Sequence, residues 1–219
     1  MKLLLFGATG MVGQGVLCEC LLDPDVESVV SIGRGTTGQQ HPKLRELLHN
    51  DFLNFSAIED QLSGFDACFF CLGVSSVGIT EEQYQRVTYG FTLAAARVLA
   101  RLNPNMTFIY VSGMGTDSSE HGRSSWARVK GKTENELLRL PFRAAYMFRP
   151  GVIVPLHGVK SKTKLYNLFY VLLAPLLPLL NGRFPNYVTT TEQVGRAMLK
   201  VARQGWPKPV LETADINKV

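Results

Sequence analysis

This sequence is poor in cysteine and histidine, with four of each among its 219 residues. The cysteines are Cys18, Cys20, Cys68 and Cys71. Cys68 and Cys71 lie in the apolar run DACFFCLG, and side chains three residues apart on a strand point to opposite faces, so this pair cannot share a metal ion or a disulfide. The histidines show no metal-binding spacing. We therefore predict no metal site, no disulfide framework and a reducing, cytoplasmic location.

Long hydrophobic runs are also missing. The apolar stretch LLLF after Lys2 ends at Gly7, which is too short for the core of a secretory signal. The apolar segment 165–180 falls short of the roughly 20 residues that cross a bilayer, and Pro175 and Pro178 interrupt it. Neither segment is expected to span a membrane. With 46% hydrophobic and 19% charged residues, the composition predicts a globular core.

Charge is unevenly distributed around a formal net value of +5. Residues 1–120 contain 7 Lys and Arg against 13 Asp and Glu (7 − 13 = −6), whereas residues 121–219 contain 16 against 5 (16 − 5 = +11). The basic half raises the question of an anionic ligand, a membrane or a nucleic acid. Because its basic residues are spread over predicted helices and loops without a known binding module, we expect no nucleic acid partner.

Strand-length apolar runs alternate with helical patterns along the chain. The predicted strands are Lys2–Phe6, Val26–Ile32, Asp66–Cys71, Thr107–Val111 and Ala144–Phe148, with a weaker candidate at Asn50–Phe55. The predicted helices are Met11–Leu22, Pro42–Leu48, Glu81–Leu102, Ser124–Leu140 and one after a capping box formed by Thr189 and Glu192. This alternation predicts an α/β protein with a doubly wound, Rossmann-type parallel sheet. We expect one domain over 1–219, with a cofactor-binding core at 1–155, a short apolar insertion at 155–188, and a terminal helix and strand at 189–219.

A glycine-rich loop follows the first predicted strand and begins the first helix. Its residues are Gly7, Ala8, Thr9, Gly10, Met11, Val12 and Gly13. Glycines permit a sharp turn, a close approach of the backbone to a pyrophosphate, and tight packing of the helix on the strand. The helix N-terminus adds oriented N–H groups and a partial positive charge. The loop therefore predicts dinucleotide binding, with a purely structural glycine turn as the alternative.

The end of the second predicted strand indicates which nicotinamide cofactor binds. A site for NAD(H) usually places an acidic residue there to bind the ribose hydroxyls. The sequence has Ser31-Ile32-Gly33-Arg34-Gly35 instead, without an acidic residue nearby. A carboxylate would repel a 2′-phosphate, whereas arginine can bind it through charge-assisted hydrogen bonds. Arg34 therefore favours NADP(H) over NAD(H), unless it is only a solvated loop residue.

The spacing G-x-x-G-x-x-G resembles that of the short-chain dehydrogenase/reductase superfamily, in its extended and atypical, epimerase-like branches. The segments CFFCLG, VKGKTENEL and FRPG are similar to the atypical branch that includes an oxidoreductase known as a Tat-interacting protein. The resemblance covers residues 1–155. It implies that Asp51 and Phe52 border the adenine and that Leu72 and Gly73 lie along the ribose and diphosphate. It also places Pro150 in a loop beside the nicotinamide.

The same resemblance assigns catalytic positions. In the family, a serine orients the substrate oxygen, and a tyrosine with a lysine four residues later transfers the proton and holds the ribose. Ser112 and Lys130 match the serine and the lysine, but Trp126 occupies the tyrosine position. Because an indole N–H only donates and does not ionise near neutral pH, Trp126 cannot transfer the proton. Ser112, a bound water or a side chain of the loop 117–121 must then do so.

Two functions from different classes are therefore open. One is an NADP(H)-dependent oxidoreductase or epimerase that acts on a small carbonyl or hydroxyl compound. The other is a non-catalytic NADP(H)-binding sensor or interaction protein. The basic, apolar segment 160–183 has three interpretations: a lid or wall over the nicotinamide, a homodimer surface, or a contact with an anionic membrane surface.

Overall fold

The protein is represented by a computed structural model that describes residues 1–156 and 184–219. Its centre is a seven-stranded parallel sheet with the strand order β3-β2-β1-β4-β5-β6-β9. The strands are β1 (Lys2–Phe6), β2 (Ser28–Gly33), β3 (Leu44–Leu48), β4 (Ala67–Phe70), β5 (Thr107–Val111), β6 (Ala144–Arg149) and β9 (Val210–Glu212). The order reverses direction between β1 and β4, as in a Rossmann-type sheet. The predicted fold class is confirmed.

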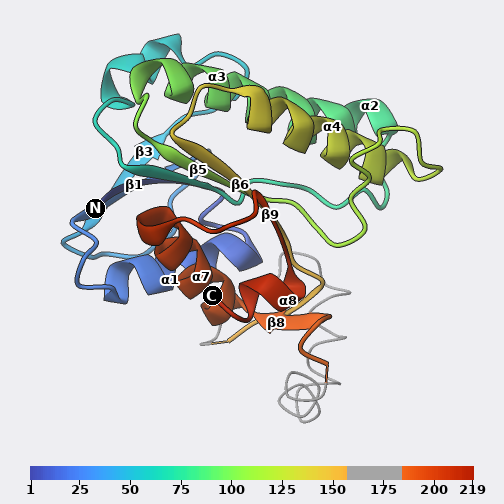
Figure 1. The fold of residues 1–219 in the computed structure, drawn as a ribbon. Coiled ribbons are helices and arrows are strands. Elements are labelled where there is room, and N and C mark those ends of the chain that lie inside the picture. Colours follow the sequence, from blue (N-terminus) through green and yellow to red (C-terminus); the bar gives the residue numbers. More distant parts are fainter. Residues whose placement is uncertain (157–183) are drawn as a thin grey trace.

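Helices cover both faces of the sheet (Figure 1). One face has α1 (Met11–Leu22), α7 (Thr191–Gln204) and the short α8 (Thr213–Ile216). The other has α2 (Glu81–Gln85), a π-helical segment at Arg86–Phe91, α3 (Thr92–Leu102) and α4 (Ser125–Arg139). A 3₁₀ turn, η1 (Ser56–Gln61), precedes β4.

The strands are apolar on both sides because each face of the sheet packs against helices. Leu3, Leu5 and Phe69 belong to the core on the side of α1 and α7. Their neighbours Leu4, Phe6 and Phe70 belong to the core on the other side. Cys68 and Cys71 follow the same alternation, lie in different clusters and are unpaired.

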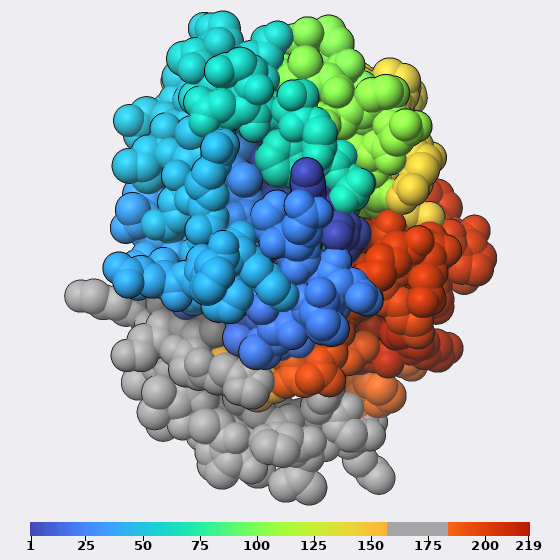
Figure 2. Space-filling view, turned by 90° about the vertical axis from the view of Figure 1, so that its left-hand side faces the viewer, coloured from blue at the N-terminus to red at the C-terminus, as the bar shows by residue number. Residues whose placement is uncertain are grey.

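Helices α1 and α7 pack at very short range, so an N-terminal and a C-terminal segment of the chain lie side by side. A Cβ added to Gly15 would lie 2.4 Å from Cβ of Thr191, and one added to Gly195 would lie 2.7 Å from Cγ of Glu19. In Figure 2 the blue N-terminal residues accordingly border the orange-red C-terminal residues. Glycine at both crossing points allows this approach.

Two predicted elements next to the second strand are wrong. Residues 42–48 were predicted to be a helix, but Leu44–Leu48 is the edge strand β3, with Leu44 beside Val29 and Leu47 beside Ile32. The leucine spacing fits a helix face as well as a half-exposed edge strand, so the spacing alone misleads. The weak strand candidate at 50–55 is a turn, in which the Asp51 carboxylate accepts a hydrogen bond from Leu53 N at 3.1 Å.

Three further boundaries differ from the prediction. The segment 81–102 contains a π-helical turn at 86–91, where a continuous α-helix was expected. The N-cap of α7 is Thr190, whose hydroxyl accepts from Gln193 N at 3.0 Å, so the predicted capping box at Thr189 is displaced by one residue. Around the predicted insertion, β7 (Val152–Val154) and β8 (Val188–Thr190) form a separate parallel pair. The segment 157–183 lies outside the described residues.

Candidate functional site

The glycine loop adopts a conformation that only residues without side chains allow. Gly7 has φ of +81°, and an added Cβ there would lie 2.6 Å from the backbone nitrogen of Leu72. An added Cβ on Gly13 would lie 2.1 Å from the carbonyl oxygen of Gly7. The loop therefore brings β1, α1 and the end of β4 into direct backbone contact.

The N-terminus of α1 offers a site for an anion. Its N-cap is Gly10, without a side-chain cap, and its first turn, which includes Met11 and Val12, has no acidic residue. The first backbone N–H groups of a helix have no partner within the helix, and the helix dipole adds positive potential at this end. Such an end favours a phosphate over the acidic side chain that often caps a helix.

A cleft extends from this helix end across the carboxyl edge of the sheet. Its first part, about 520 Å³, is enclosed mainly by the ends of β1 and β2. It is lined by Gly7, Ala8, Thr9, Gln14, Ser31, Ile32, Gly33, Arg34, Gly35, Thr36, Thr37, Gln39, Phe52 and Leu72. A second part, about 370 Å³, shares four of these residues and continues along Gly10, Met11, Cys71, Gly73, Val74 and Ser75.

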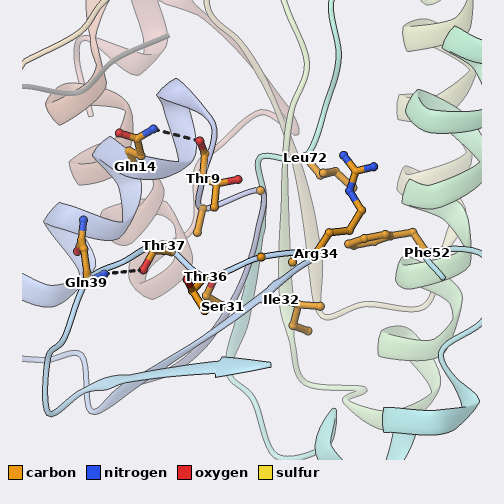
Figure 3. Close-up of a pocket in the computed structure, with 14 residues that line it drawn as sticks. Thr9, Gln14, Ser31, Ile32, Arg34, Thr36, Thr37, Gln39, Phe52 and Leu72 are labelled. Carbon is orange, nitrogen blue, oxygen red and sulfur yellow. Dashed lines mark hydrogen bonds between the residues drawn. The ribbon is translucent and has the colours of Figure 1, made fainter. Parts of the chain in front are cut away.

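Arg34 lies where both parts of the cleft meet. Its side chain extends past the ring of Phe52 toward Leu72 (Figure 3). The following loop supplies the hydroxyls of Thr36 and Thr37. The acidic side chain that approaches this loop is Glu46 on the edge strand, and its carboxylate accepts a hydrogen bond from Thr37 N at 2.5 Å. The Glu46 carboxylate is thus bonded to the backbone of the loop. The cleft beside this loop is lined by the Arg34 side chain and by the side chains of Thr36 and Thr37.

Phe52 and Asp51 differ in their relation to the cleft. Phe52 is 3% exposed, lines the cleft and stacks on Phe91 with ring centroids 5.6 Å apart. Asp51 is exposed, and its carboxylate holds the turn at Leu53. Phe52 is thus the side chain of this pair that forms a wall of the cleft.

Ser112 is buried at the end of β5, one strand beyond the cleft. Its Oγ lies 3.0 Å from Oγ1 of Thr116, and that hydroxyl donates to the carbonyl oxygen of Gly113 at 2.8 Å. Because a threonine hydroxyl has one proton, Ser112 donates in the bond that it shares with Thr116. In this arrangement the Ser112 hydroxyl can still accept a hydrogen bond, because its proton is already donated to Thr116.

Lys130 and Trp126 lie one turn apart on α4 and so share one face of this helix. Lys130 Nζ is 5.3 Å from the ring centroid of Tyr110. Burial lowers the pKa of Lys130 to about 8, although the carboxylate of Glu134 opposes this shift. The Trp126 ring approaches Gly115, where an added Cβ would lie 3.5 Å from Cη2 of the indole.

A buried ion pair fixes α4 against β6. Glu134 is 1% exposed and receives hydrogen bonds from Arg149 Nε at 3.0 and 3.1 Å and from Nη2 at 2.5 Å. Arg149 also contacts Glu212 at 3.2 Å. Pro150 follows, and its carbonyl oxygen accepts from Met114 N at 3.0 Å. These bonds hold the ends of β5 and β6 beside each other.

The structure brings the predicted cofactor residues together in two groups. Along the cleft lie Gly7, Thr9, Gly10, Met11, Arg34, Phe52, Leu72 and Gly73. Ser112 and Pro150 follow the strands β5 and β6, and Lys130 lies on α4 with its Nζ over the Tyr110 ring. Gln14, Thr36, Thr37 and Gln39 also line the cleft and were missed from the sequence. A polar loop after the second strand was the available signal, but polar loops are common at surfaces.

A glycine loop, a free helix end and a cleft at the point where the strand order reverses together define a dinucleotide-binding protein of the Rossmann class. A sequence model of the NAD-dependent epimerase/dehydratase family matches residues 3–138. The match covers more than half of the chain, and the chain belongs to this family. The resemblance to the epimerase-like branch of the short-chain dehydrogenases/reductases is thus confirmed.

Curated relatives and solved structures extend this result. The chain is 25% identical over 158 residues to the mitochondrial protein FMP52 of Candida albicans, covering 70% of this chain and 68% of that protein. It is 23% identical over 214 residues to the mitochondrial protein FMP52-2 of Scheffersomyces stipitis, covering 95% and 90%. The Bordetella bronchiseptica enzyme WbmF, solved with NAD⁺, shares the fold with a TM-score of 0.68 and 15% identity, covering 99% of this chain and 76% of that one. WbmF has also been solved with NAD⁺ and UDP.

The names of these relatives overturn the predicted cytoplasmic location, since they point to mitochondria. The four cysteines are unpaired in the structure. Among the helices described, none has the length and apolarity to cross a bilayer. Within residues 1–156 and 184–219, no group of three His, Cys, Asp or Glu side chains is placed to hold a metal ion.

Proposed function

We propose that this protein binds NADP(H) and uses it as an oxidoreductase or epimerase on a small carbonyl or hydroxyl compound. The observation that carries the proposal is the position of Arg34, a cation where the two parts of the cleft meet. No acidic side chain among the described residues forms an ion pair with Arg34. Its guanidinium is therefore available to bind a 2′-phosphate through two parallel hydrogen bonds.

Each part of the site has a role in this proposal. The N–H groups at the start of α1 bind the diphosphate, and Phe52 and Arg34 enclose the adenine end. Lys130 holds the ribose next to the nicotinamide, whose chemistry when bound is hydride transfer. Ser112 positions the substrate oxygen after its hydroxyl turns away from Thr116. The family is described as NAD-dependent, so NAD(H) is the alternative cofactor. Arg34 favours NADP(H) over it, because NAD(H) has no 2′-phosphate for the guanidinium to bind.

Proton transfer is the step in which this protein departs from its family. The indole N–H of Trp126 does not ionise near neutral pH, so Trp126 cannot transfer a proton to the substrate. On the loop 117–121, the Asp117 carboxylate accepts from Ser119 and Gly122, and these hydrogen bonds lower its pKa, so it is ionised at neutral pH and cannot donate a proton. Ser112, a water that it holds, or another side chain of this loop is then the proton donor. The same Trp126 favours the second candidate function, a non-catalytic NADP(H)-binding sensor or interaction protein.

Oxidation of NADPH with a panel of small carbonyl compounds, followed at 340 nm, separates these functions. If the protein is an enzyme, the wild type consumes NADPH. The Ser112→Ala variant then does so at least about tenfold more slowly, because the group that orients the substrate is removed. A sensor binds NADPH without consuming it, and Trp126→Tyr introduces turnover by restoring a proton donor. Absence of NADPH binding by the wild type contradicts both candidates.

A further inference from the structure

The loops after β4, β5 and β6 have no charged residue close to their strands. They begin with CLGVSSVGIT at 71–80, SGMGT at 112–116 and PGVIVPL at 150–156. Because these three strands are neighbours in a parallel sheet, their carboxyl ends lie side by side at the edge that also holds the glycine loop. In this edge, the half beyond the cofactor cleft is thus uncharged for several residues from each strand.

The nearest described cations are Lys130, which the proposed function assigns to the cofactor ribose, and two arginines that are engaged in hydrogen bonds and ion pairs. Arg149, the last residue of β6, is 11% exposed in its side chain and bonds to Glu134 and Glu212. Arg128 on α4 donates to the carbonyl oxygens of Gly122 and Arg123 at 2.9 and 3.1 Å and contacts Glu81 at 3.3 Å. This half of the edge therefore contrasts with the adenine end, where Arg34 is available.

The segments that follow these strands contain exposed apolar side chains. Val74, Val77 and Val152 are 44%, 81% and 45% exposed. Val74 lines the second part of the cleft, next to Gly73 and Met11. Met114 is half-buried, and its Cε would lie 2.7 Å from a Cβ added to Gly151, which places it between the ends of β5 and β6.

We infer that the substrate is an uncharged, apolar carbonyl compound or alcohol, whose hydrocarbon part packs against Val74, Met114, Trp126 and Val152. This inference rests on the proposed function, since it names the substrate class for that site. Burial of exposed aliphatic side chains favours a hydrocarbon ligand. A phosphate or carboxylate would find only Lys130 among the described cations at these strand ends, and the proposed function assigns Lys130 to the cofactor ribose.

Binding of 2-alkanones to the NADP⁺-saturated protein, which cannot donate a hydride to the ketone, tests the inference, with calorimetry as the readout. We expect affinity to rise along 2-hexanone, 2-octanone and 2-decanone, by up to about fourfold for each methylene that becomes buried. UDP and UDP-glucuronic acid are expected not to bind to this complex. Equal affinities along the series, or binding of either uridine nucleotide in competition with the ketones, would overturn the inference.

A pair of exposed positions provides matched variants. Val152→Lys places a charge at the inferred site, next to Gly151, and Leu22→Lys places one on α1, where Leu22 is 72% exposed. Both positions are exposed enough to accept lysine without loss of folding. We expect Val152→Lys to weaken 2-decanone binding at least tenfold and Leu22→Lys to leave it unchanged, with NADPH affinity equal in both. Equal ketone affinity in the two variants contradicts the inference, whereas loss of NADPH binding by the wild type contradicts the proposed function itself.

Discussion

Substitution of Gly13 by alanine tests the packing of the glycine loop. An added Cβ would lie 2.1 Å from the carbonyl oxygen of Gly7 and 2.9 Å from Cα of Ala8. Both neighbours are backbone atoms, so no side chain can turn away to relieve the contact. Overpacking of this kind costs about 3 kcal/mol or more, and the better helix propensity of alanine returns about 1 kcal/mol. We expect a net loss of about 2 kcal/mol.

For a chain of 219 residues, this loss corresponds to a fall of about 4–8 °C in the midpoint of thermal unfolding. Circular dichroism at rising temperature measures it. Gly73→Ala is the matched control, because nothing lies within 4 Å of its added Cβ. That variant should unfold like the wild type, yet bind NADPH at least tenfold more weakly because the methyl group enters the cleft. An unchanged midpoint for Gly13→Ala would refute the packing argument.

Three other outcomes follow from the charged and hydroxyl groups of the site. Lys130 has a pKa of about 8 in the folded protein, below its value of about 10.4 in an unfolded chain, so the unfolded state binds more protons between these values. The difference in unfolding free energy between wild type and Lys130→Met should therefore rise with pH from about 8 to 10.5 in urea titrations, and a flat difference contradicts the burial of Lys130. Arg149→Met should destabilise the fold by about 3–5 kcal/mol in the same titrations, because it leaves Glu134 charged and buried, and Glu134→Gln in the same chain should restore part of that loss. Thr116→Val should keep NADPH affinity but change kcat for carbonyl reduction, since Ser112 loses the acceptor of its proton; Thr116→Ser should behave as the wild type.

Much of the fold could be predicted from local patterns. The apolar runs at β1, β4 and β5 and the glycine loop are continuous in sequence. The residues of each segment are therefore enough to predict its structure. The leucines of β3 are not enough, because their spacing suits two structures and only pairing with β2 decides between them. The pairing of β7 with β8 joins segments more than 30 residues apart, so no local pattern could indicate it.

The site shows the same division. Gly7, Gly10 and Arg34 follow from chemistry that a short motif can express. Glu46 is 12 residues from Arg34, and its bond to Thr37 N depends on how the edge strand lies beside β2. The use of Arg149 by Glu134 and Glu212 likewise joins three elements that only the folded chain places together. The apolar half of the sheet edge became visible because strand order sets which loops are neighbours.

The binding of NADPH and NADH by the wild type and by Arg34→Ala tests the central claim most directly. Dissociation constants come from nicotinamide fluorescence at one ionic strength, with Arg45→Ala, an exposed arginine on β3, as the control. Loss of charge-assisted hydrogen bonds to a phosphate costs about 1.5–3 kcal/mol, which is a fall of about 10- to 150-fold in affinity. We predict this fall for NADPH with Arg34→Ala, little change for NADH, and a wild type that prefers NADPH. Equal affinities of the wild type for both cofactors, or no effect of Arg34→Ala, would contradict the account.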